Sequence, residues 1–368
     1  MILGKKRLTL RDKRQLEFAE MFLKSPDKRG VLHLCPRFGK IFTSINILER
    51  MDWGIRILIA YPDMKIKKSW EEDFKIRKYN DCEVTYTTHL SIKKHVDEKF
   101  DIVIIDEIHL LSEAQIEACK LLFKKNKVVL GLTGTLTYDS EKTLYDELNL
   151  QVIGEYSIEQ GIIEGVTADY EIHVLQVPLD NKTFKDYKGK KKTEKKHFDN
   201  ISWVIDNNQR QGIDTMFLRL ARMRVIQNSL AKLNATKHLL NQFANERILV
   251  FCGITKIADA LGIPSYHSKS TEKQIFTDFT EGKGNHLAVV KIGNTGITYT
   301  PLNKVIINYF DSNAQNLTQK INRCMSMEYD NPDKKAMIYI ICTTENVEQK
   351  WLNKALEFFD KDKIKYYN

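Results

Sequence analysis

Short runs of aliphatic residues recur along this chain and constrain its fold more than any other feature. Most of them are separated by stretches whose apolar residues have helical spacing. Runs rich in Ile, Val and Leu that alternate with helices are typical of strands buried on both faces of a parallel sheet. The predicted strands are residues 31–35, 55–60, 102–105 and 128–132 in the first half, and 248–252, 287–292, 305–309 and 336–342 in the second.

The two sets of runs predict an α/β protein made of two units in tandem. A chain of 368 residues is long enough for two domains, each with its own core. Ser112 and Gln115 form a capping-box pattern at the start of one predicted helix. We expect the domains to span residues 1–165 and 166–368, with an exposed basic insertion or linker near 181–211.

The composition is that of an ordinary globular protein, with 42% hydrophobic and 29% charged residues. No stretch of ~18 consecutive apolar residues occurs, and the N-terminus is charged where a signal peptide is apolar, so we expect a cytoplasmic protein without a membrane partner. The six cysteines form no C-x-x-C pair and are expected to be buried thiols. The net charge of +9 suits a polyanion, although a solvated basic surface would give the same count.

LCPRFGKIF, residues 34–42, lies between an apolar run and a predicted helix, where a phosphate-binding loop would lie. The pattern G-x-x-x-x-G-K-[ST] matches only Gly39 and Lys40, because Leu34 replaces its first glycine and Ile41 replaces its hydroxyl residue. Thr43 and Ser44 follow, but they lie on other faces of the helix. The motif alone therefore leaves open whether this is a nucleotide site.

FDIVIIDEIH, residues 100–109, places Asp106 and Glu107 at the carboxyl end of a buried strand, where ligands of open α/β sheets bind. In a nucleotide site Asp106 would hold Mg²⁺ and Glu107 would polarise the attacking water. The alternative is a solvated turn or a helix N-terminus, both of which favour acidic residues.

The order of the motifs distinguishes these readings. KVVLGLTGTLT ends a strand with Thr133 and Thr135, and QNLTQKINRCMSM places Gln319 and Arg323 on a predicted helix. The whole succession resembles the superfamily two helicases and translocases of the DExH type. That resemblance implies two tandem RecA-like domains, each a mainly parallel sheet flanked by helices, with ATP and Mg²⁺ in the cleft between them.

The resemblance also implies roles for individual residues. Lys40, Asp106, Glu107 and Arg323 would be catalytic, with Asp106 as the metal ligand and Arg323 reaching the γ-phosphate. The remaining positions would be Gln15, Arg37, Phe38, Gly39, Ile41, Gly296 and Gln319 for nucleotide binding, His109, Thr133 and Thr135 for coupling, and Pro62, Thr88, Cys252 and Gly253 for nucleic-acid binding. Apart from the resemblance, the charge of the lysine run predicts that Lys190, Lys191 and Lys192 also bind nucleic acid.

Several of these residues also have simpler interpretations. Gln15 could be an exposed helical glutamine, His109 a packed histidine, and the lysine run at 188–196 a solvated insertion. Trp70, Trp203 and Trp351 could stack on bases, but core or interface tryptophans are more common. These alternatives stay open at the level of the sequence.

The stretch EYSIEQGIIEGVTADYEI, which links the two halves, looks like the connection in phage branch-migration helicases and restriction-type translocases. We therefore expect an ATP-dependent helicase or translocase that acts on DNA rather than RNA, works as a monomer and is phage-encoded, which would place it in the host cytoplasm. Little chain remains beyond the motor core, so partner proteins would supply specificity.

Two departures support a different class of function. The family pattern Q-x-x-G-R-x-x-R has Asn322 in place of its glycine and Ser326 in place of its final arginine. Ile41 and Ser326 are the evidence for an alternative, a nucleic-acid-binding or regulatory protein that keeps the helicase fold but has weak or absent ATPase activity. The intact Lys40, Asp106, Glu107 and Arg323 argue against this alternative. A small-molecule kinase does not explain the second α/β unit.

Overall fold

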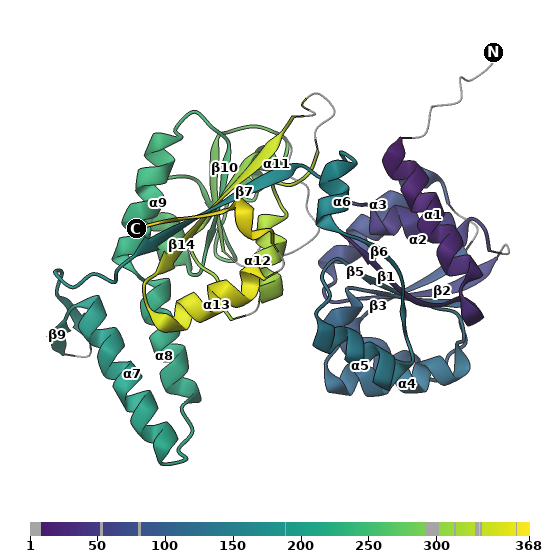
Figure 1. Ribbon diagram of the computed structural model, residues 1–368, viewed down its shortest axis with the longest axis horizontal. Helices are drawn as coiled ribbons and strands as arrows, with labels where there is room; N and C mark the ends of the chain where they lie inside the picture. Colours follow the sequence, from purple (N-terminus) through teal and green to yellow (C-terminus); the bar gives the residue numbers. More distant parts are fainter. Residues whose placement is uncertain are drawn as a thin grey trace. The chain divides into compact units, whose positions relative to one another are not determined.

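The computed structural model describes residues 9–368 except 52–53, 80–81, 188, 291–301, 313, 328–330, 332 and 358. Internal contacts divide the chain into two units, Met1–Thr167 and Ala168–Asn368, each with its own sheet and core (Figure 1). Two parallel α/β units were expected from the alternation of aliphatic runs and helices, and this fold class is confirmed.

The first unit contains a six-stranded sheet with the order β3-β2-β4-β5-β1-β6, in which every pair of neighbours is parallel. The four strands predicted for this half are confirmed, and two others were missed. The strands are β1 (Arg29–Leu34), β2 (Ile55–Tyr61), β3 (Cys82–Thr88), β4 (Ile102–Asp106), β5 (Val129–Thr133) and β6 (Val152–Tyr156).

Helices cover both faces of this sheet, because successive strand residues point to opposite sides (Figure 1). Ile57 and Ile59 pack in the cluster that contains residues of α1, α2 and α3, whereas Leu58 and Ala60 pack in the cluster that contains residues of α4 and α5. The capping box predicted at Ser112 is present at the start of α4. The helical segments are α1 (Leu10–Lys24), η1 (Pro26–Lys28), α2 (Lys40–Leu48), α3 (Lys65–Arg77), η2 (His89–His95), η3 (Ile108–Leu110), α4 (Glu113–Lys125), α5 (Tyr138–Leu148) and α6 (Ile158–Ile163).

The second unit contains a seven-stranded parallel sheet with the order β11-β12-β10-β13-β14-β7-β15. The four strands predicted for this half are confirmed. The first strand, β7, lies between the last two and pairs with β14 along its whole length, from Asp169 opposite Lys335 to Val177 opposite Thr343. The strands are β7 (Asp169–Val177), β10 (Ile248–Cys252), β11 (Ser265–Tyr266), β12 (His286–Val290), β13 (Lys304–Ile307), β14 (Lys335–Thr343) and β15 (Ile364–Tyr367).

The lysine-rich stretch near 181–211 is a folded element rather than a linker. An antiparallel hairpin, β8 (Lys185–Tyr187) and β9 (Lys190–Lys192), leads into two long helices, α7 (Glu194–Arg210) and α8 (Met216–Gln227). Thr193 caps α7 by accepting the backbone N–H of Lys196. The other helical segments of the unit are α9 (Leu230–Gln242), α10 (Thr255–Ala260), α11 (Gln274–Thr280), α12 (Ala314–Ile321), α13 (Asn346–Leu356) and η4 (Lys361–Lys363).

Within the described residues, no helix has the length and apolar character needed to span a bilayer. The expected burial of the cysteines is confirmed for five of the six, since only Cys82 is partly exposed.

Candidate nucleotide site

A tight loop connects β1 to α2 at the carboxyl edge of the first sheet. The backbone N–H of Cys35 donates to Tyr156 O at 2.9 Å, and that of Phe38 donates to Cys35 O at 3.2 Å. Gly39 has a φ of 97°, and a Cβ atom there would lie 2.4 Å from Gln15 Nε2. Only glycine fits this close, left-handed position. The loop thereby leads directly into the N-terminus of α2, where backbone N–H groups and the helix dipole favour an anion.

Gln15 supports the loop from α1. Its side chain is only 4% exposed, and Nε2 donates to Phe38 O at 2.7 Å. The interpretation of Gln15 as an exposed helical glutamine is therefore wrong, because α1 packs against α2 and places the amide under the loop. Its assignment to nucleotide binding stays a prediction.

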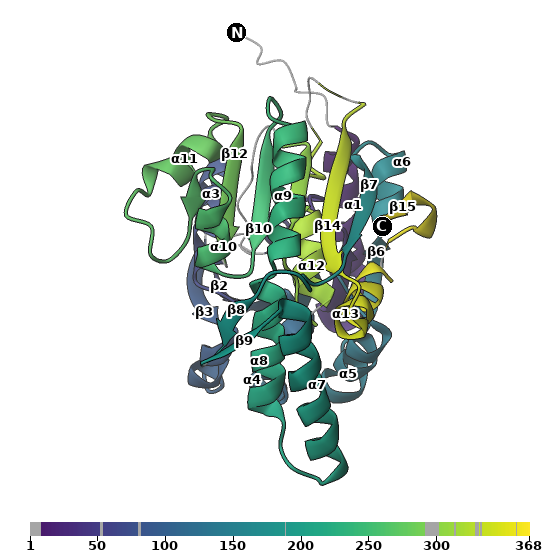
Figure 2. The same ribbon diagram turned by 90° about the vertical axis from the view of Figure 1, so that its left-hand side faces the viewer.

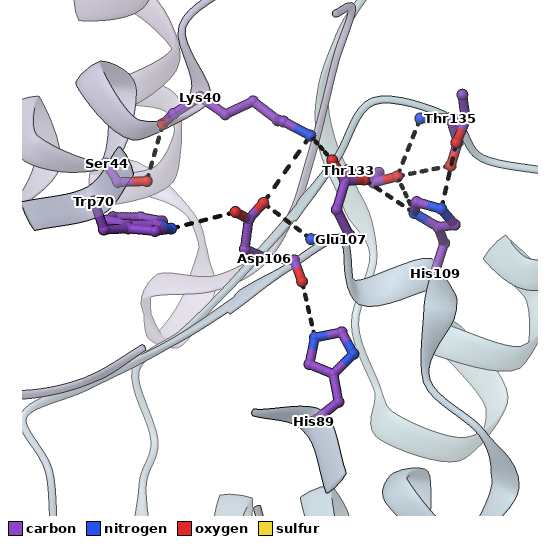
Figure 3. Close-up of polar contacts among 9 residues, drawn as sticks. All are labelled: Lys40, Ser44, Trp70, His89, Asp106, Glu107, His109, Thr133 and Thr135. Atoms are coloured by element: carbon purple, nitrogen blue, oxygen red, sulfur yellow. Dashed lines mark hydrogen bonds and ion pairs between the residues drawn. The ribbon is translucent and has the colours of Figure 1, made fainter. Parts of the chain in front are cut away.

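Lys40 begins α2 and extends to the end of β4 (Figure 3). Its Nζ contacts the carboxylate of Glu107 and lies 4.0 Å from Asp106 Oδ1. Burial alone would lower the pKa of Lys40, but the two carboxylates outweigh burial and raise it above its ordinary value. Burial alone would raise the pKa of Glu107, but Lys40 and His109 hold it below its ordinary value. Near neutral pH the lysine is protonated and the glutamate is ionised.

Asp106 ends β4 as a carboxylate that is 5% exposed and accepts hydrogen bonds on both oxygens. Trp70 Nε1 donates to Oδ2 at 3.3 Å, and the backbone N–H of Glu107 donates to Oδ1 at 3.0 Å (Figure 3). Burial raises the pKa of Asp106 to about 6, although Lys40 opposes the shift. A base-stacking role for Trp70 is wrong, because its ring is fully buried beside Phe74.

His109 connects the ends of β4 and β5. Its Nδ1 lies 2.7 Å from Thr133 Oγ1 and its Nε2 lies 3.3 Å from Thr135 Oγ1, both within hydrogen-bond reach. Nδ1 is also 3.5 Å from Glu107 Oε2. Burial lowers the pKa of His109 to about 4, so the ring is neutral at pH 7. The side chain is thus packed, and it connects the ends of two strands. Its assignment to coupling stays a prediction.

The hydroxyl groups of α2 are engaged by the helix backbone. Thr43 Oγ1 donates to Gly39 O at 3.2 Å, and Ser44 Oγ donates to Lys40 O at 3.1 Å. Ile41 packs against the hydrophobic core of the first unit. A Mg²⁺ ion prefers oxygen ligands and keeps several waters. The buried carboxylate of Asp106 is an oxygen ligand of the kind such an ion takes, and would hold it if Mg²⁺ binds here.

The assignment of Phe38 to nucleotide binding needs correction. Phe38 cannot contact a nucleotide through its side chain, because its ring is fully buried. The centroid of this ring lies 5.5 Å from that of Phe18 and 4.6 Å from that of Tyr156. Only its backbone lines the loop. Pro62 follows β2 and Thr88 ends β3, both at the same edge of the sheet. Their assignment to nucleic-acid binding stays a prediction.

The residues predicted in the second unit belong to several different elements. Cys252 ends β10 but is 6% exposed, so its side chain is part of the core rather than a nucleic-acid contact. Gly253 follows, and a Cβ atom there would lie 2.7 Å from the ring of Tyr309. Gln319 lies on α12 and Arg323 just after it, 7% exposed. The remaining positions are Lys190, Lys191 and Lys192, which form β9, Arg37, which is half-buried at a φ of 70°, and Gly296, which lies outside the described residues.

Sequence reasoning did not assign two residues that hold Asp106. His89 Nε2 lies 2.9 Å from the carbonyl oxygen of Asp106, and Trp70 bonds to its side chain. Neither residue belongs to the motif that contains Asp106. Trp70 lies on α3, and His89 begins the η2 segment that follows β3. Both segments are distant from Asp106 in sequence, and the fold of the sheet brings them to the end of β4.

Comparison with known proteins agrees with this geometry. Residues 12–138 match the family described as type III restriction enzyme, res subunit, and residues 231–328 match the helicase conserved C-terminal domain. The first match includes Lys40, Asp106 and Glu107, and the second includes Arg323. These matches support the resemblance of this chain to superfamily two helicases and translocases.

Individual proteins match most of the length of this chain. DNA 3'-5' translocase XPB2 of Sulfurisphaera tokodaii is 23% identical over 375 residues, which cover 92% of this chain and 82% of XPB2. A putative HsdR subunit of a type I restriction enzyme from Vibrio vulnificus has a TM-score of 0.62 at 15% identity, covering 97% of this chain and 67% of that one. Dbp5 of S. cerevisiae bound to RNA and ADP BeF3 has a TM-score of 0.63 at 12% identity, covering 96% and 89%. The two structures share the tandem RecA-like fold with this chain.

Trp70 offers a test of how Asp106 is held. Trp70→Phe keeps an aromatic ring in the core but removes the N–H that donates to Oδ2. Because groups that orient a metal ligand typically contribute 10–100-fold to metal affinity, we expect the Mg²⁺ concentration for half-maximal ATP hydrolysis to rise about tenfold. A calorimetric titration of Mg²⁺ into the protein in the presence of ADP should show that Mg²⁺ affinity weakens by a similar factor.

Trp351→Phe is the matched control, since Trp351 packs in a cluster of the second unit, whereas Asp106 belongs to the first. An unchanged Mg²⁺ dependence in Trp70→Phe would mean that the indole contributes only to packing.

Proposed function

We propose that this protein is an ATP-dependent DNA translocase or helicase. The observation that carries the proposal is the buried cluster of Lys40, Asp106 and Glu107, in which the lysine is held protonated and Glu107 ionised. DNA is favoured over RNA because XPB2, which this chain matches over 82% of the length of XPB2, is a DNA translocase.

The chain's own residues suggest how the reaction proceeds. The amides at the start of α2 and Lys40 would bind the phosphates. Mg²⁺, held by Asp106 and water, would neutralise charge on the phosphates when bound. Glu107 would orient the attacking water, and Arg323 would stabilise the charge that develops on the γ-phosphate.

His109 suggests how the nucleotide state could reach the rest of the first unit. It lies 3.5 Å from Glu107 and within hydrogen-bond reach of Thr133 and Thr135. A shift of Glu107 on loss of the γ-phosphate would therefore alter contacts at the end of β5. This connection supports the proposed coupling role of the three residues.

The experiment that tests this function is steady-state ATP hydrolysis by the full chain, alone and with single- or double-stranded DNA or RNA. Stimulation by DNA above the rate of a Lys40→Ala variant is the expected result. Stimulation by RNA alone would replace the proposed substrate. Nucleic-acid binding with no hydrolysis above that of Lys40→Ala would favour the binding or regulatory protein that Ile41 and Ser326 suggest.

Because Ile41 has no hydroxyl group, the site would lack one oxygen ligand for Mg²⁺. Replacing Ile41 tests whether this limits hydrolysis. Ile41→Thr supplies the missing oxygen, so we expect faster ATP hydrolysis at limiting Mg²⁺ and a smaller gain at saturating Mg²⁺. The measurement is a Mg²⁺ titration of hydrolysis rates. Ile41 packs against the core, so the lost apolar contacts should cost about 1 kcal/mol of stability.

Ile41→Val is the matched control, because it removes bulk from the same core contact without adding a hydroxyl. If Ile41→Thr and Ile41→Val have the same Mg²⁺ dependence as the parent protein, the hydroxyl is compensated elsewhere or hydrolysis is not the task of this protein.

A further inference from the structure

Most of the net charge of this protein lies in one short segment. Residues 181–229, here called the basic arm, contain twelve Lys and Arg and five Asp and Glu, a net charge of +7. The whole chain has a net charge of +9. The basic arm therefore concentrates positive charge in a way that the rest of the chain does not, and this favours a polyanionic partner.

The base of the arm is fixed to the second unit. Phe198 of α7 and Val225 of α8 pack in one buried cluster with Leu179 and Tyr309. Glu194 is 1% exposed, accepts the Nζ of Lys185 at 2.7 Å and caps the start of α9. Beyond this base, α7 and α8 lie side by side and extend away from the strands (Figures 1 and 2). The arm is thus a folded helical hairpin that projects from the second unit.

The far end of the arm is apolar and exposed. Four neighbouring residues have large exposed fractions: Ile213 (50%), Met216 (53%), Phe217 (77%) and Leu220 (41%). Phe217, Leu220 and Arg224 follow helical spacing along one side of α8, and Arg219 and Arg224 are exposed as well. An apolar end flanked by arginines is not what a merely solvated insertion requires.

Charge and apolar exposure together indicate what covers this end. Lysine and arginine bind the phosphates of a nucleic acid without regard to sequence. An exposed aromatic ring binds bases by stacking, which contributes about fivefold to 100-fold to affinity per base. Bases are open to such stacking only where they are unpaired. A site where a duplex meets a single strand can use both kinds of group, because basic residues bind the phosphates and an aromatic ring stacks on an unpaired base.

We propose that the basic arm is a nucleic-acid-binding surface that holds a junction between duplex and single-stranded DNA. The lysines of β9 and the arginines of α8 contact the backbone, and Phe217 stacks on an unpaired base beside the duplex. The proposal rests on nucleic acid being the partner of this protein, and it does not depend on ATP hydrolysis.

The test measures binding by the full chain to three DNA probes without nucleotide: a fork with single-stranded tails, a blunt duplex and a single strand. Phe217→Ala should weaken binding to the fork and the single strand about fivefold or more and leave the blunt duplex unchanged. Phe217→Tyr, which keeps the ring, should bind like the parent protein. Tyr138→Ala, which removes an exposed aromatic ring of the first unit, is the matched control.

A second variant tests the charged part of the arm. Replacing Lys190, Lys191 and Lys192 with glutamine should weaken binding to all three probes and reduce the slope of log affinity against log salt by up to about 2.7 for duplex DNA. The control replaces Lys124, Lys125 and Lys127, three exposed lysines of the first unit. Equal effects of the two triple variants would overturn the role of the arm in DNA binding.

The outcomes separate this proposal from the proposed function. An equal loss of affinity for all probes in Phe217→Ala would overturn base stacking. If neither arm variant changes DNA binding, the proposal is wrong and an acidic protein becomes the better candidate for this surface. If the arm variants behave as expected while the parent protein hydrolyses no ATP, the arm stands and the motor function fails.

Discussion

Replacing Glu107 with glutamine should lower ATP turnover by about 100-fold or more while ATP still binds. The carboxylate of Glu107 is held ionised beside Lys40 and can orient and polarise a water, whereas an amide of nearly the same shape cannot act as a base. In the proposed function the phosphates would be bound mainly by Lys40 and the loop before α2, so ATP affinity should change little. Single-turnover hydrolysis and an equilibrium ATP-binding measurement test the two halves of this prediction.

Glu117→Gln is a suitable control, because Glu117 lies on the exposed side of α4 in the same unit and its side chain is 67% exposed. It should have the turnover of the parent protein. If Glu107→Gln also retains normal turnover, Glu107 is not the residue that activates water.

Replacing Arg323 with alanine should lower ATP hydrolysis on the order of 10³-fold or more, the range that arginine fingers contribute where they act. Arg323 carries this expectation because Ser326 occupies the position of the other arginine of the motif. The segment after α12 is also fixed in the second unit, since Met325 O accepts the backbone N–H of Ala168 at 2.9 Å. Turnover numbers, together with ATP affinity and the melting temperature, provide the measurement.

Arg323→Lys distinguishes charge from geometry. Lysine keeps the positive charge but lacks the planar, forked donors that bind phosphate oxygens in pairs, so its rate should fall between those of the parent and alanine variants. A normal rate in Arg323→Ala with an unchanged melting temperature would leave the second unit without a part in the chemistry.

The sequence predicted the centre of each sheet better than its edges. β4 and β10 are continuous aliphatic runs because both of their faces are buried, and such runs are easy to recognise. β3, with the sequence CEVTYTT, lies at an edge of its sheet and is partly exposed along most of its length. β7 alternates polar and apolar residues in part, so its sequence lacks the continuous aliphatic run by which a buried strand is recognised. Edge position and partial exposure weaken the hydrophobic signal on which the prediction depends.

The candidate site was predictable where motifs are local in sequence. Gly39 and Lys40, and likewise Asp106 and Glu107, are adjacent pairs at the ends of strands. The bonds from Gln15 to the loop and from Trp70 to Asp106 join residues that are 23 and 36 positions apart. Such contacts depend on the packing of helices α1 and α3, which no local pattern encodes. Motif membership also did not reveal that the side chains of Phe38 and Cys252 belong to the cores.

The position of β7 between β14 and β15 has a consequence for synthesis of the chain on the ribosome. The first unit is complete in sequence once Thr167 has emerged, so it can fold while translation continues. β7 emerges next, but both of its partner strands are made only near the C-terminus. Both edges of β7 therefore stay without strand partners during most of the synthesis of the second unit, and exposed strand edges promote aggregation. A nascent chain that stalls before β14 should thus depend on chaperones, whereas one that stalls soon after Thr167 should not.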